Sequence, residues 1–571
     1  MDYRVRYEAW LNDKALDEAT RSELLAIKDE KELHDRFYRD LEFGTAGLRG
    51  VMGAGSNRMN IYTVGRATQG LANHLLSLAG AKDKGVVIAF DSRNRSSEFA
   101  LRSALILAAN GIKAYIFPSI RAVPQLSFAI GRLCCAAGIV ITASHNPKEY
   151  NGFKVYGENG AQINPETASL ITSEIDSVPD FSAIRLIGEA KARGEGLLVT
   201  VPNEVDEAYF DYTMSLALDK SVLNAAKELS IVYTPLFGAG TEPVKRILTT
   251  AGVKKLYIVE SQSKPNGDFP GLSAPNPEVS EAYCEAEKLA TEVGAELMLA
   301  TDPDADRLGV SVKRGGKFHT LTGNQIGCLV LHYRLSKLKE QNRLPADGYV
   351  VKSIVSTNFA NAIARSFGVR MDEVLTGFRF IGEKIDESEK TGEGTFLFGF
   401  EESYGFLAGT KVRDKDAILA ALMIAETAAY YSLRSMSLLD GLDELYQKYG
   451  CYRESVKSYT LKGAEGMAQI SSTMESLREN PPKTVFDREV LAFRDYSEGV
   501  RKEGATVVPL GLPPSNVLYY ELGDGDWLCV RPSGTEPKLK VYAGASEPCE
   551  EDASARVNAY VAAAGELLGM K

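Results

Sequence analysis

The sequence has few cysteines for its length, and none of them form a ligand-like pair. Its 571 residues include seven cysteines. Only Cys134 and Cys135 are adjacent and no CxxC pair occurs, so the sequence indicates neither a zinc site nor a disulfide framework. We therefore expect reduced thiols and a cytoplasmic location.

Long apolar runs are also missing. The N-terminal residues MDYRVRYEAWLNDKALDEAT are charged throughout and lack the apolar core of a signal peptide. The most apolar helical stretch, residues 417–425, is flanked by charged residues and is shorter than the roughly 18 residues that indicate a membrane span. We expect a buried helix there and no membrane partner.

An excess of basic residues is absent as well. The formal net charge is −11 at pH 7, whereas nucleic-acid-binding proteins need a basic surface to displace counterions from phosphates. Nucleic acid is therefore not an expected partner, and any phosphate site must be local. With 44% hydrophobic and 25% charged residues, the composition is that of an ordinary globular protein.

The length of 571 residues is too great for one hydrophobic core. At about 150 residues per domain, it predicts three to four domains. Residues 3 to about 40 contain no Gly or Pro and have apolar positions at helical spacing, which predicts an amphipathic helical segment. Beyond it, strand patterns precede helical patterns, as is typical of βαβ units with a largely parallel sheet. The clearest strand patterns are residues 86–90, 114–117, 229–233 and 349–354.

We predict an α/β fold class: three related α/β domains with mixed, largely parallel sheets and a C-terminal α+β domain, around a central cleft. The last domain differs because helical residues 463–479 precede strand patterns near 517–522 and 527–530. The predicted ranges are 1–205, which includes the helical segment, 206–320, 321–450 and 451–571.

A displayed serine follows an apolar strand pattern. The run Gly138-Ile-Val-Ile-Thr-Ala-Ser-His-Asn-Pro147 indicates a buried strand that ends in a polar turn, so the hydroxyl group of Ser144 is displayed at the strand end. A serine hydrolase would need a GxSxG elbow, which is absent here. His145 fits a substrate or phosphate contact better than the base of a catalytic triad.

Three aspartates alternate in Thr301-Asp-Pro-Asp-Ala-Asp-Arg307, directly after the apolar segment 296–300. Open α/β sheets place ligands at the carboxyl ends of their strands, and alternate residues of an extended stretch point the same way. Because clustered carboxylates repel one another without a hard cation, Asp302, Asp304 and Asp306 predict a Mg²⁺ or Ca²⁺ site. An EF-hand does not fit, because Arg307 and Lys313 occupy its glycine and glutamate positions. The alternative is a solvated, Asp-rich turn.

The stretch Val530-Arg-Pro-Ser-Gly-Thr-Glu-Pro537 has the chemistry of a phosphate cradle. Arg531 supplies a guanidinium, Ser533 and Thr535 supply hydroxyl groups, and Gly534 supplies an amide that an anion can approach closely. No Walker loop occurs. A second Gly-Thr-Glu-Pro, at 240–243, lacks the upstream Arg and Ser and predicts an ordinary helix start. The glycines of 44–50 do not have the spacing of a dinucleotide fingerprint.

These motifs, with Lys154 ten residues after the serine in Asn151-Gly-Phe-Lys154, resemble the α-D-phosphohexomutase superfamily of phosphoglucomutases and phosphomannomutases. They run from Gly44 to Pro537 in the family's order. The length and N-terminal segment are most similar to the bacterial phosphoglucomutase and phosphoglucomutase 2 branch. The resemblance implies an isomerase, an intramolecular phosphotransferase that interconverts sugar 1-phosphate and sugar 6-phosphate, with glucose favoured, through a phosphoserine and a bisphosphosugar intermediate.

The resemblance also implies roles for individual residues. Ser144, Lys154, His145 and Arg49 would be catalytic. One Mg²⁺ per active site would bind Ser144, Asp302, Asp304 and Asp306, and glucose 1,6-bisphosphate would act as the activator. A phosphosugar would contact Thr45, Arg49, Ser144, His145, Lys154, Asp306, Arg307, Thr376, Glu401, Ser403, Lys415, Arg531, Ser533, Gly534 and Thr535.

Two departures from the family pattern leave proton transfer unassigned. Tyr404 and Gly405 follow Ser403, where the phosphomannomutase branch has His shortly afterwards, and Arg379 stands where many relatives have Lys. The sequence also leaves open the oligomeric state and the choice among glucose, mannose, N-acetylglucosamine and ribose phosphates. The alternatives are a phosphopentomutase, a glucose 1,6-bisphosphate synthase, a phosphate-ester hydrolase and a non-catalytic sugar-phosphate-binding protein.

Overall fold

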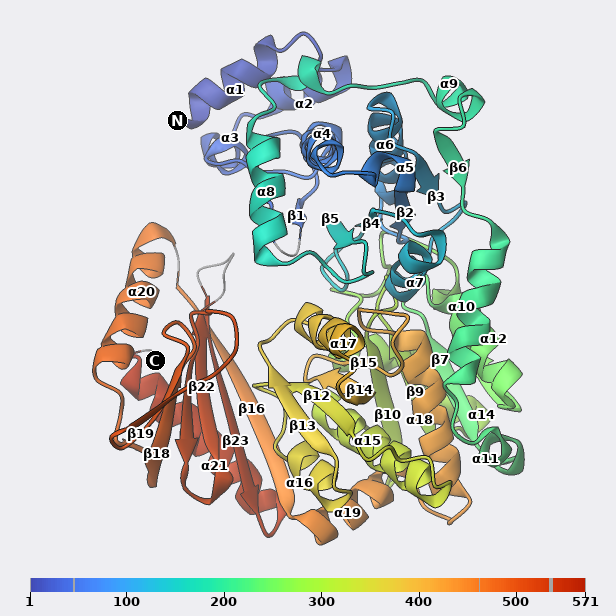
Figure 1. Cartoon of the computed structure of the whole chain (residues 1–571), viewed down its shortest axis with the longest axis vertical. Coiled ribbons are helices and arrows are strands. Elements are labelled where there is room, and N and C mark those ends of the chain that lie inside the picture. The colour runs from blue at the N-terminus through green and yellow to red at the C-terminus, as the bar shows by residue number, and fades with distance from the viewer. Residues whose placement is uncertain (1, 45–46, 462, 533–537, 570–571) are drawn as a thin grey trace. The chain divides into compact units, whose positions relative to one another are not determined.

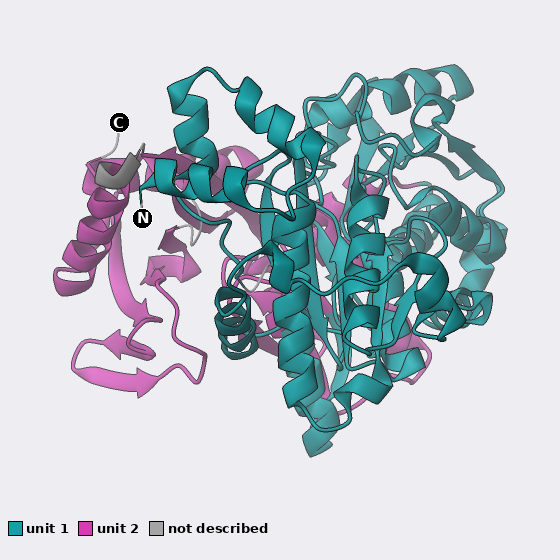
Figure 2. Cartoon of the chain, turned by 90° about the horizontal axis from the view of Figure 1, so that it is seen from above, with its two compact units in different colours: residues 1–322, 381–398, 403–435 teal, residues 323–380, 399–402, 436–571 magenta. Residues whose placement is uncertain are grey.

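The computed structural model describes residues 2–44, 47–461, 463–532 and 538–569. The chain folds into two compact units, coloured teal and magenta in Figure 2. Unit 1 comprises residues 1–322, 381–398 and 403–435, and unit 2 comprises residues 323–380, 399–402 and 436–571.

Unit 1 begins with three short helices, as the helical pattern predicts. The side chains of Asp2, Asp17 and Asp29 cap them, each accepting a hydrogen bond from a backbone N–H in the first turn. Trp10 and Phe37 lie in the apolar cluster that these helices bury. The helices are α1 (Tyr3–Asn12), α2 (Glu18–Ala26) and α3 (Glu30–Phe37).

The first sheet of unit 1 has six strands in the order β1-β5-β4-β2-β3-β6 (Figure 1). Strands β4, β2, β3 and β6 are parallel, and β5 runs antiparallel to both β1 and β4. Alternate residues of β2 enter two separate cores, with Val86 and Ile88 in one and Val87 and Ala89 in the other, so both faces of the sheet are covered. The elements are β1 (Leu48–Val51), α4 (Ile61–Ser77), α5 (Ala81–Lys84), β2 (Val86–Phe90), α6 (Ser96–Ala109), β3 (Ala114–Ile116), α7 (Val123–Leu133), β4 (Ala137–Ile141), β5 (Tyr150–Gly157), α8 (Pro165–Asp176), α9 (Glu189–Gly194), β6 (Leu198–Thr200) and α10 (Asn203–Ser215).

The second sheet of unit 1 has five strands in the order β11-β10-β9-β7-β8. Strands β8, β7 and β9 are parallel, whereas β10 and β11 form an antiparallel hairpin that turns at Gly315 and Gly316. Helix α12 begins at Thr241, where the second Gly-Thr-Glu-Pro predicts a helix start. The elements are α11 (Lys220–Ala225), β7 (Ser230–Thr234), α12 (Thr241–Ala251), β8 (Lys255–Ile258), α13 (Glu260–Ser263), α14 (Cys284–Val293), β9 (Leu297–Thr301), β10 (Leu308–Arg314) and β11 (Lys317–Thr320).

Helix α18 (Ala417–Ser432) completes unit 1 and is buried along most of its length, as the apolar stretch predicts. Its cap, Asp416, accepts a hydrogen bond from the backbone N–H of Leu419 and another from the hydroxyl group of Tyr209. None of the described helices combines the length and the apolar character that a membrane-spanning helix needs. Most of α17 (Arg379–Thr391) and strand β15 (Gly405–Leu407) also belong to unit 1.

Unit 2 contains a parallel strand pair and an antiparallel sheet. Strands β12 and β13 are parallel, and the sheet has the order β16-β23-β22-β21-β18-β19-β20, with β17 beside β18. Helices α20 and α21 contribute Met474 and Tyr560 to the core that covers one face of this sheet. The elements are α15 (Gly323–Glu340), β12 (Gly348–Ser353), α16 (Phe359–Ser366), β13 (Arg370–Val374), the end of β14 (Thr395–Glu401), α19 (Leu438–Tyr449), β16 (Cys451–Thr460), α20 (Gly463–Glu479), β17 (Thr484–Val485), β18 (Arg488–Asp495), β19 (Val500–Glu503), β20 (Thr506–Pro509), β21 (Leu518–Leu522), β22 (Trp527–Pro532), β23 (Lys538–Glu547) and α21 (Glu550–Leu567). The predicted fold class, α/β units with mixed, largely parallel sheets followed by an α+β segment, is confirmed.

Candidate active site

Ser144 lies in the turn between β4 and β5, at the carboxyl end of the parallel part of the first sheet. Its φ of 53° is in the left-handed region, which residues other than glycine seldom adopt. The backbone N–H of Ser144 donates to Thr142 Oγ1 at 2.8 Å. Ser144 is buried, so the prediction of a displayed hydroxyl group is wrong: the hydroxyl group is directed at Asp302 inside the protein.

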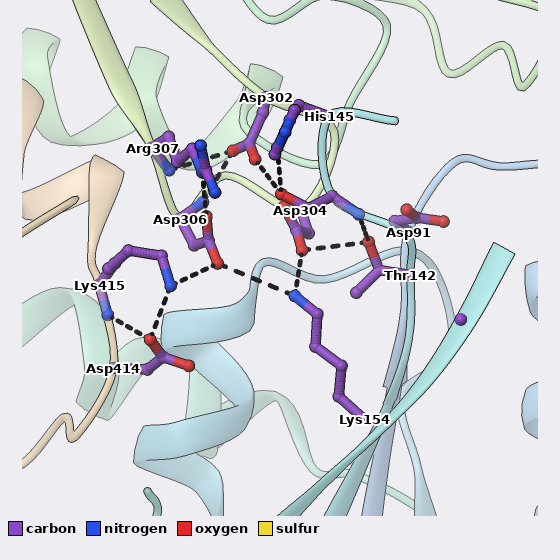
Figure 3. A network of polar contacts seen from close by, with 12 residues as sticks. Asp91, Thr142, His145, Lys154, Asp302, Asp304, Asp306, Arg307, Asp414 and Lys415 are labelled. Carbon is purple, nitrogen blue, oxygen red and sulfur yellow. Dashed lines mark hydrogen bonds and ion pairs between the residues drawn. The ribbon is translucent and has the colours of Figure 1, made fainter. Parts of the chain in front are cut away.

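The three aspartates of the loop between β9 and β10 lie close together (Figure 3). Ser144 lies beside them. Ser144 Oγ donates to Asp302 Oδ2 at 2.7 Å. Asp302, Asp304 and Asp306 are all buried, and each offers one carboxylate oxygen within 4.8 Å of the others. The hydroxyl group of Ser144 and three carboxyl groups from a distant part of the sequence therefore share one small space.

Two lysines face the aspartates from opposite sides (Figure 3). Lys154 Nζ, on β5, lies 3.0 Å from Asp304 Oδ2 and 3.9 Å from Asp306 Oδ2. Lys415 Nζ, just before α18, lies 3.1 Å from Asp306 Oδ2 and 3.0 Å from Asp414 Oδ1. Each lysine is thus shared between two carboxylates.

The pKa values of the aspartates reflect this crowding. Burial raises the pKa of Asp302 well above its usual value, and repulsion from Asp304 and Asp306 adds to the effect. Burial and the charge of Asp304 also raise the pKa of Asp306. Burial opposes ionisation of Asp304 too, but Lys154 and the other nearby donors hold its pKa below the usual value. Lys154, Lys415 and Arg307 together therefore do not compensate all three carboxylates.

The donor atoms at this site fit a hard divalent cation. Asp304 Oδ1 and Asp306 Oδ1 are buried, and neither accepts a hydrogen bond from any described residue. Buried acceptors are rarely left unsatisfied, because their desolvation is not repaid. An all-oxygen set of three carboxylates and a serine hydroxyl group suits Mg²⁺ better than zinc.

Three further predicted residues surround Ser144. His145 Nδ1 lies 3.1 Å from Ser144 Oγ, and burial together with Arg307 and Arg49 lowers the pKa of His145 well below its ordinary value. Arg49, on β1, donates from Nη1 to Asn146 Oδ1 at 3.1 Å. Arg307, at the end of the aspartate loop, pairs with Glu278 at 2.5 Å. The serine turn thus lies among basic side chains.

Ser403 lies in the turn between β14 and β15, and its neighbour Tyr404 is anchored to the second sheet. The carbonyl group of Tyr404 accepts from the backbone N–H of Leu308 at 3.1 Å. The hydroxyl group of Tyr404 donates to the Leu321 carbonyl oxygen at 3.0 Å. Because Leu308 directly follows Arg307, the turn that carries Ser403 is tied to the end of the aspartate loop.

Three predicted residues lie in unit 2. Glu401 Oε1 accepts from the backbone N–H of Gly377 at 2.6 Å. The hydroxyl group of Thr376 is buried and has no hydrogen-bond partner among the described residues. Arg531 lies near the end of β22, opposite Lys540 of β23. The remaining predicted residues, Thr45, Ser533, Gly534 and Thr535, lie outside the described residues.

The sequence did not single out some residues that hold the site together. Thr142 Oγ1 donates to Asp304 Oδ2 at 3.1 Å and so connects the serine turn to the aspartate loop. Asp414 accepts from the hydroxyl group of Tyr156 at 2.8 Å while it pairs with Lys415. Thr142 and Asp414 lie inside stretches that the motifs cover, whereas nothing in the sequence pointed to Tyr156.

Comparison with known proteins explains this arrangement. Models of the four domains described as phosphoglucomutase/phosphomannomutase, namely alpha/beta/alpha domains I, II and III and the C-terminal domain, match residues 40–180, 207–316, 322–449 and 486–563. The chain belongs to the phosphoglucomutase/phosphomannomutase family. The family resemblance predicted from the motifs is therefore confirmed.

Curated members of the phosphoglucomutase/phosphomannomutase family match over nearly the whole chain. A phosphoglucomutase of Staphylococcus aureus (strain bovine RF122 / ET3-1) is 36% identical over 536 residues, covering 93% of this chain and 94% of that protein. A phosphoglucomutase of Staphylococcus epidermidis (strain ATCC 35984) is 36% identical over 542 residues, covering 94% of this chain and 96% of that protein.

Solved structures share the family fold at lower identity. The pp63/parafusin phosphoglucomutase of Paramecium, in an open form, has a TM-score of 0.69 at 18% identity and covers 93% of this chain and 95% of that one. A phosphoglucomutase/phosphomannomutase family protein from Burkholderia thailandensis has a TM-score of 0.66 at 18% identity and covers 92% and 97%. At this identity, the two likenesses support the fold alone.

Proposed function

We propose that this chain is a phosphosugar mutase that interconverts sugar 1-phosphate and sugar 6-phosphate, with glucose phosphates as its main substrates. The observation that carries the proposal is the contact between Ser144 Oγ and the buried carboxylates, at 2.7 Å from Asp302 Oδ2. A protein that only binds a sugar phosphate has no need of a hydroxyl group held beside three carboxylates. The preference for glucose rests on curated relatives of similar length, which are named phosphoglucomutase.

In the proposed cycle, Ser144 carries a phosphoryl group in the resting enzyme. The bond between phosphorus and Ser144 Oγ breaks as phosphorus bonds to the free hydroxyl oxygen of the sugar monophosphate. The proton of that hydroxyl group passes to a basic group of the site, and Ser144 Oγ takes up a proton from the site. The resulting sugar bisphosphate turns over, and Ser144 Oγ then takes back the other phosphoryl group. The net result is the movement of phosphate between C1 and C6.

The residues around Ser144 would bind and orient the phosphate that is transferred. Arg49, His145, Lys154 and Arg307 offer donors near the serine, and Lys154 is our candidate for the general acid and base. Mg²⁺ would be held by Ser144, Asp302, Asp304 and Asp306. It would neutralise charge on the phosphoryl group during transfer. Glucose 1,6-bisphosphate would activate the enzyme by phosphorylating Ser144.

The remaining assignments extend the proposal to the rest of the chain. Thr45, Asp306, Thr376, Glu401, Ser403 and Lys415 would contact the substrate, and Arg531, Ser533, Gly534 and Thr535 would bind its non-reacting phosphate. We also propose the domain ranges 1–205, 206–320, 321–450 and 451–571 and a cytoplasmic location, with a phosphosugar as the partner and neither nucleic acid nor membrane.

Comparative kinetics test the choice of substrate. We expect kcat/KM for glucose 1-phosphate to exceed that for ribose 1-phosphate by about 100-fold, the range that binding contacts to a sugar can discriminate. Product formation is measured with excess Mg²⁺ and a trace of glucose 1,6-bisphosphate. A higher kcat/KM for ribose 1-phosphate would make the chain a phosphopentomutase, and release of inorganic phosphate faster than isomerisation would make it a phosphatase.

A further inference from the structure

Arg93 lies at the centre of the serine turn, although no motif includes it. It follows β2 and precedes α6, and only 3% of the residue is exposed. Its Nη1 donates to the carbonyl oxygens of Pro147 at 2.9 Å and Tyr150 at 3.1 Å. Its Nη2 donates to the carbonyl oxygens of Ser144 and Asn146. One guanidinium therefore binds four carbonyl groups of residues 144–150.

This use of the guanidinium limits what Arg93 can do. The four hydrogens on Nη1 and Nη2 are used by four backbone oxygens, and the fifth donor, Nε, is buried and lies 3.3 Å from Asp91 Oδ2. The planar fork is also the side chain best suited to reach four acceptors at once, because lysine offers three donors from a single point. Arg93 is therefore placed to act on the shape of the serine turn and not on the substrate directly.

Arg93 is itself held in place. Its Nε lies 3.3 Å from Asp91 Oδ2, and both side chains are fully buried. Asp91 Oδ1 accepts from the backbone N–H of Arg93 at 2.9 Å and from Ser96 Oγ at 2.7 Å. On the other side, the guanidinium lies 5.0 Å from the centre of the Phe269 ring. The fork is thus fixed before any ligand binds.

The serine turn needs such a support. The φ of 53° at Ser144 persists only where surrounding contacts fix the backbone, because this conformation costs roughly 1–3 kcal/mol. The carbonyl group of Pro147 also accepts from the backbone N–H of Tyr150 at 3.1 Å, and Arg93 adds a side-chain donor for each of its four carbonyl partners. Release of these carbonyl groups would let the turn relax and would carry Ser144 Oγ away from Asp302.

We propose that Arg93 is a positioning residue for phosphoryl transfer: it holds the turn 144–150 in the conformation that keeps Ser144 Oγ beside the aspartates. The inference rests on the proposed role of Ser144 as phosphoryl carrier. A misplacement of a reacting atom by about 1 Å can cost roughly 100-fold in rate. Replacement of Arg93 should therefore lower the rate of phosphoryl transfer and leave the affinity for the sugar phosphate unchanged.

The test compares Arg93→Lys with Arg58→Lys as a matched control. Arg58 is also a buried arginine of unit 1 that donates to backbone carbonyl groups and to one carboxylate, but its partners are Asp35 and Asn57. We expect Arg93→Lys to lower kcat by about 100-fold with KM for glucose 1-phosphate within about 3-fold of wild type. The control should keep kcat within about 2-fold, even where its loss of Tm is similar.

Two direct readouts separate positioning from general stability. In Arg93→Lys, transfer of labelled phosphoryl from glucose 1,6-bisphosphate to Ser144 should slow by the same factor as kcat. Amide hydrogens of the peptide 142–152 should exchange faster, whereas peptides of the second sheet should be unchanged. If Arg93→Lys does not fold, Asp91→Asn replaces it, because it keeps the guanidinium and removes the charge that lies beside Nε. A smaller fall in kcat with unchanged KM is then expected.

The inference is overturned if folded Arg93→Lys, or folded Asp91→Asn in its place, labels Ser144 at the wild-type rate. It is also overturned if kcat falls no further than in Arg58→Lys. The proposed function fails in a different way: wild-type protein would then carry no label on Ser144 at all.

Discussion

Asp302, Asp304 and Asp306 place three carboxyl groups in a buried space, where Lys154, Lys415 and Arg307 are cations in contact with them. Arg307 also pairs with Glu278. Lys415 is shared with Asp414, so its charge is divided between two carboxylates. At the scale of single residues, the site is therefore short of positive charge. A divalent cation would remove this imbalance and satisfy the two carboxylate oxygens that accept no hydrogen bond from the described residues.

Replacement of one aspartate should be visible in the metal dependence of activity. We expect Asp304→Asn to raise the Mg²⁺ concentration for half-maximal activity by about 100-fold or more, because even the outer partners of a metal site contribute 10–100-fold in affinity. Titration of mutase activity with Mg²⁺ after treatment with EDTA measures this shift.

A matched control for this substitution is Asp206→Asn. Asp206 is also buried and accepts hydrogen bonds from Arg121 and Gln125, but it lies outside the aspartate cluster. Its Mg²⁺ titration should be unchanged. An unchanged titration for Asp304→Asn would remove this residue from the metal site.

The serine and the aspartates could be singled out from the sequence because each follows a strand pattern directly, and open α/β sheets bind ligands at the carboxyl ends of their strands. Thr142 and Asp414 lie within the same stretches, but a threonine directly after a strand or an aspartate beside a lysine carries no local signal. Arg93 and Tyr156 act through contacts with residues 51 and 258 positions away, respectively. Such contacts depend on the packing of complete elements.

At the scale of elements, close packing of backbone against backbone fixes the strands that carry the site. Gly152 on β5 pairs with Arg49 on β1, and a Cβ atom at Gly152 would lie 2.4 Å from the carbonyl oxygen of Thr142. At Gly47, just before β1, φ is +73° and a Cβ atom would lie 1.9 Å from the carbonyl oxygen of Phe153. Both glycines allow an approach that no other residue permits.

Gly47→Ala should disturb the site through β1. The substitution combines the penalty of a positive φ with a direct clash against β5, which carries Lys154. We expect a loss of at least about 3 kcal/mol in unfolding free energy by urea denaturation, together with reduced mutase activity.

Gly80→Ala is the control that measures the cost of a positive φ without a steric clash. Gly80 has a similar φ of +75°, but nothing lies within 4 Å of its Cβ position. Its cost should be about 1–2 kcal/mol, with mutase activity unchanged. Equal costs for the two substitutions would show that contact with β5 is unimportant.

Helices and strands could be predicted where their own residues show a clear periodic pattern of apolar positions. The strands at 86–90 and 349–354 and the helix at 463–479 have clear periodicity and are found as β2, β12 and α20. The points at which the chain passes from one unit to the other could not be predicted. Residues 381–398 and 403–435 belong to unit 1, whereas residues 399–402 belong to unit 2. Nothing local marks such crossings.

At the scale of the whole molecule, each unit contains one of the two tryptophans of the chain. Trp10 packs edge-on against Tyr62 and Phe181 in unit 1. Trp527 stacks on Tyr519 in unit 2. The variants Trp527→Phe and Trp10→Phe therefore report the unfolding of unit 1 and unit 2 separately by fluorescence.

The metal should stabilise only one of these transitions. Because the aspartate cluster lies in unit 1, Mg²⁺ at about 100 times its Kd should raise the midpoint reported by Trp10 by roughly 3 °C. The midpoint reported by Trp527 should not change. A shift confined to Trp527, or an equal shift at both tryptophans, would contradict the assignment of the cation to unit 1.

The most direct measurement follows the phosphoryl group itself. Dephosphorylated protein is incubated with glucose 1,6-bisphosphate labelled in its phosphates, and the labelled residue is located by peptide mapping. We expect one phosphoryl group per chain, on Ser144, which leaves as labelled sugar phosphate when unlabelled glucose 1-phosphate is added; Ser144→Ala should take no label and should have no mutase activity. A label on another residue, or full activity of Ser144→Ala, would show that Ser144 is not the carrier.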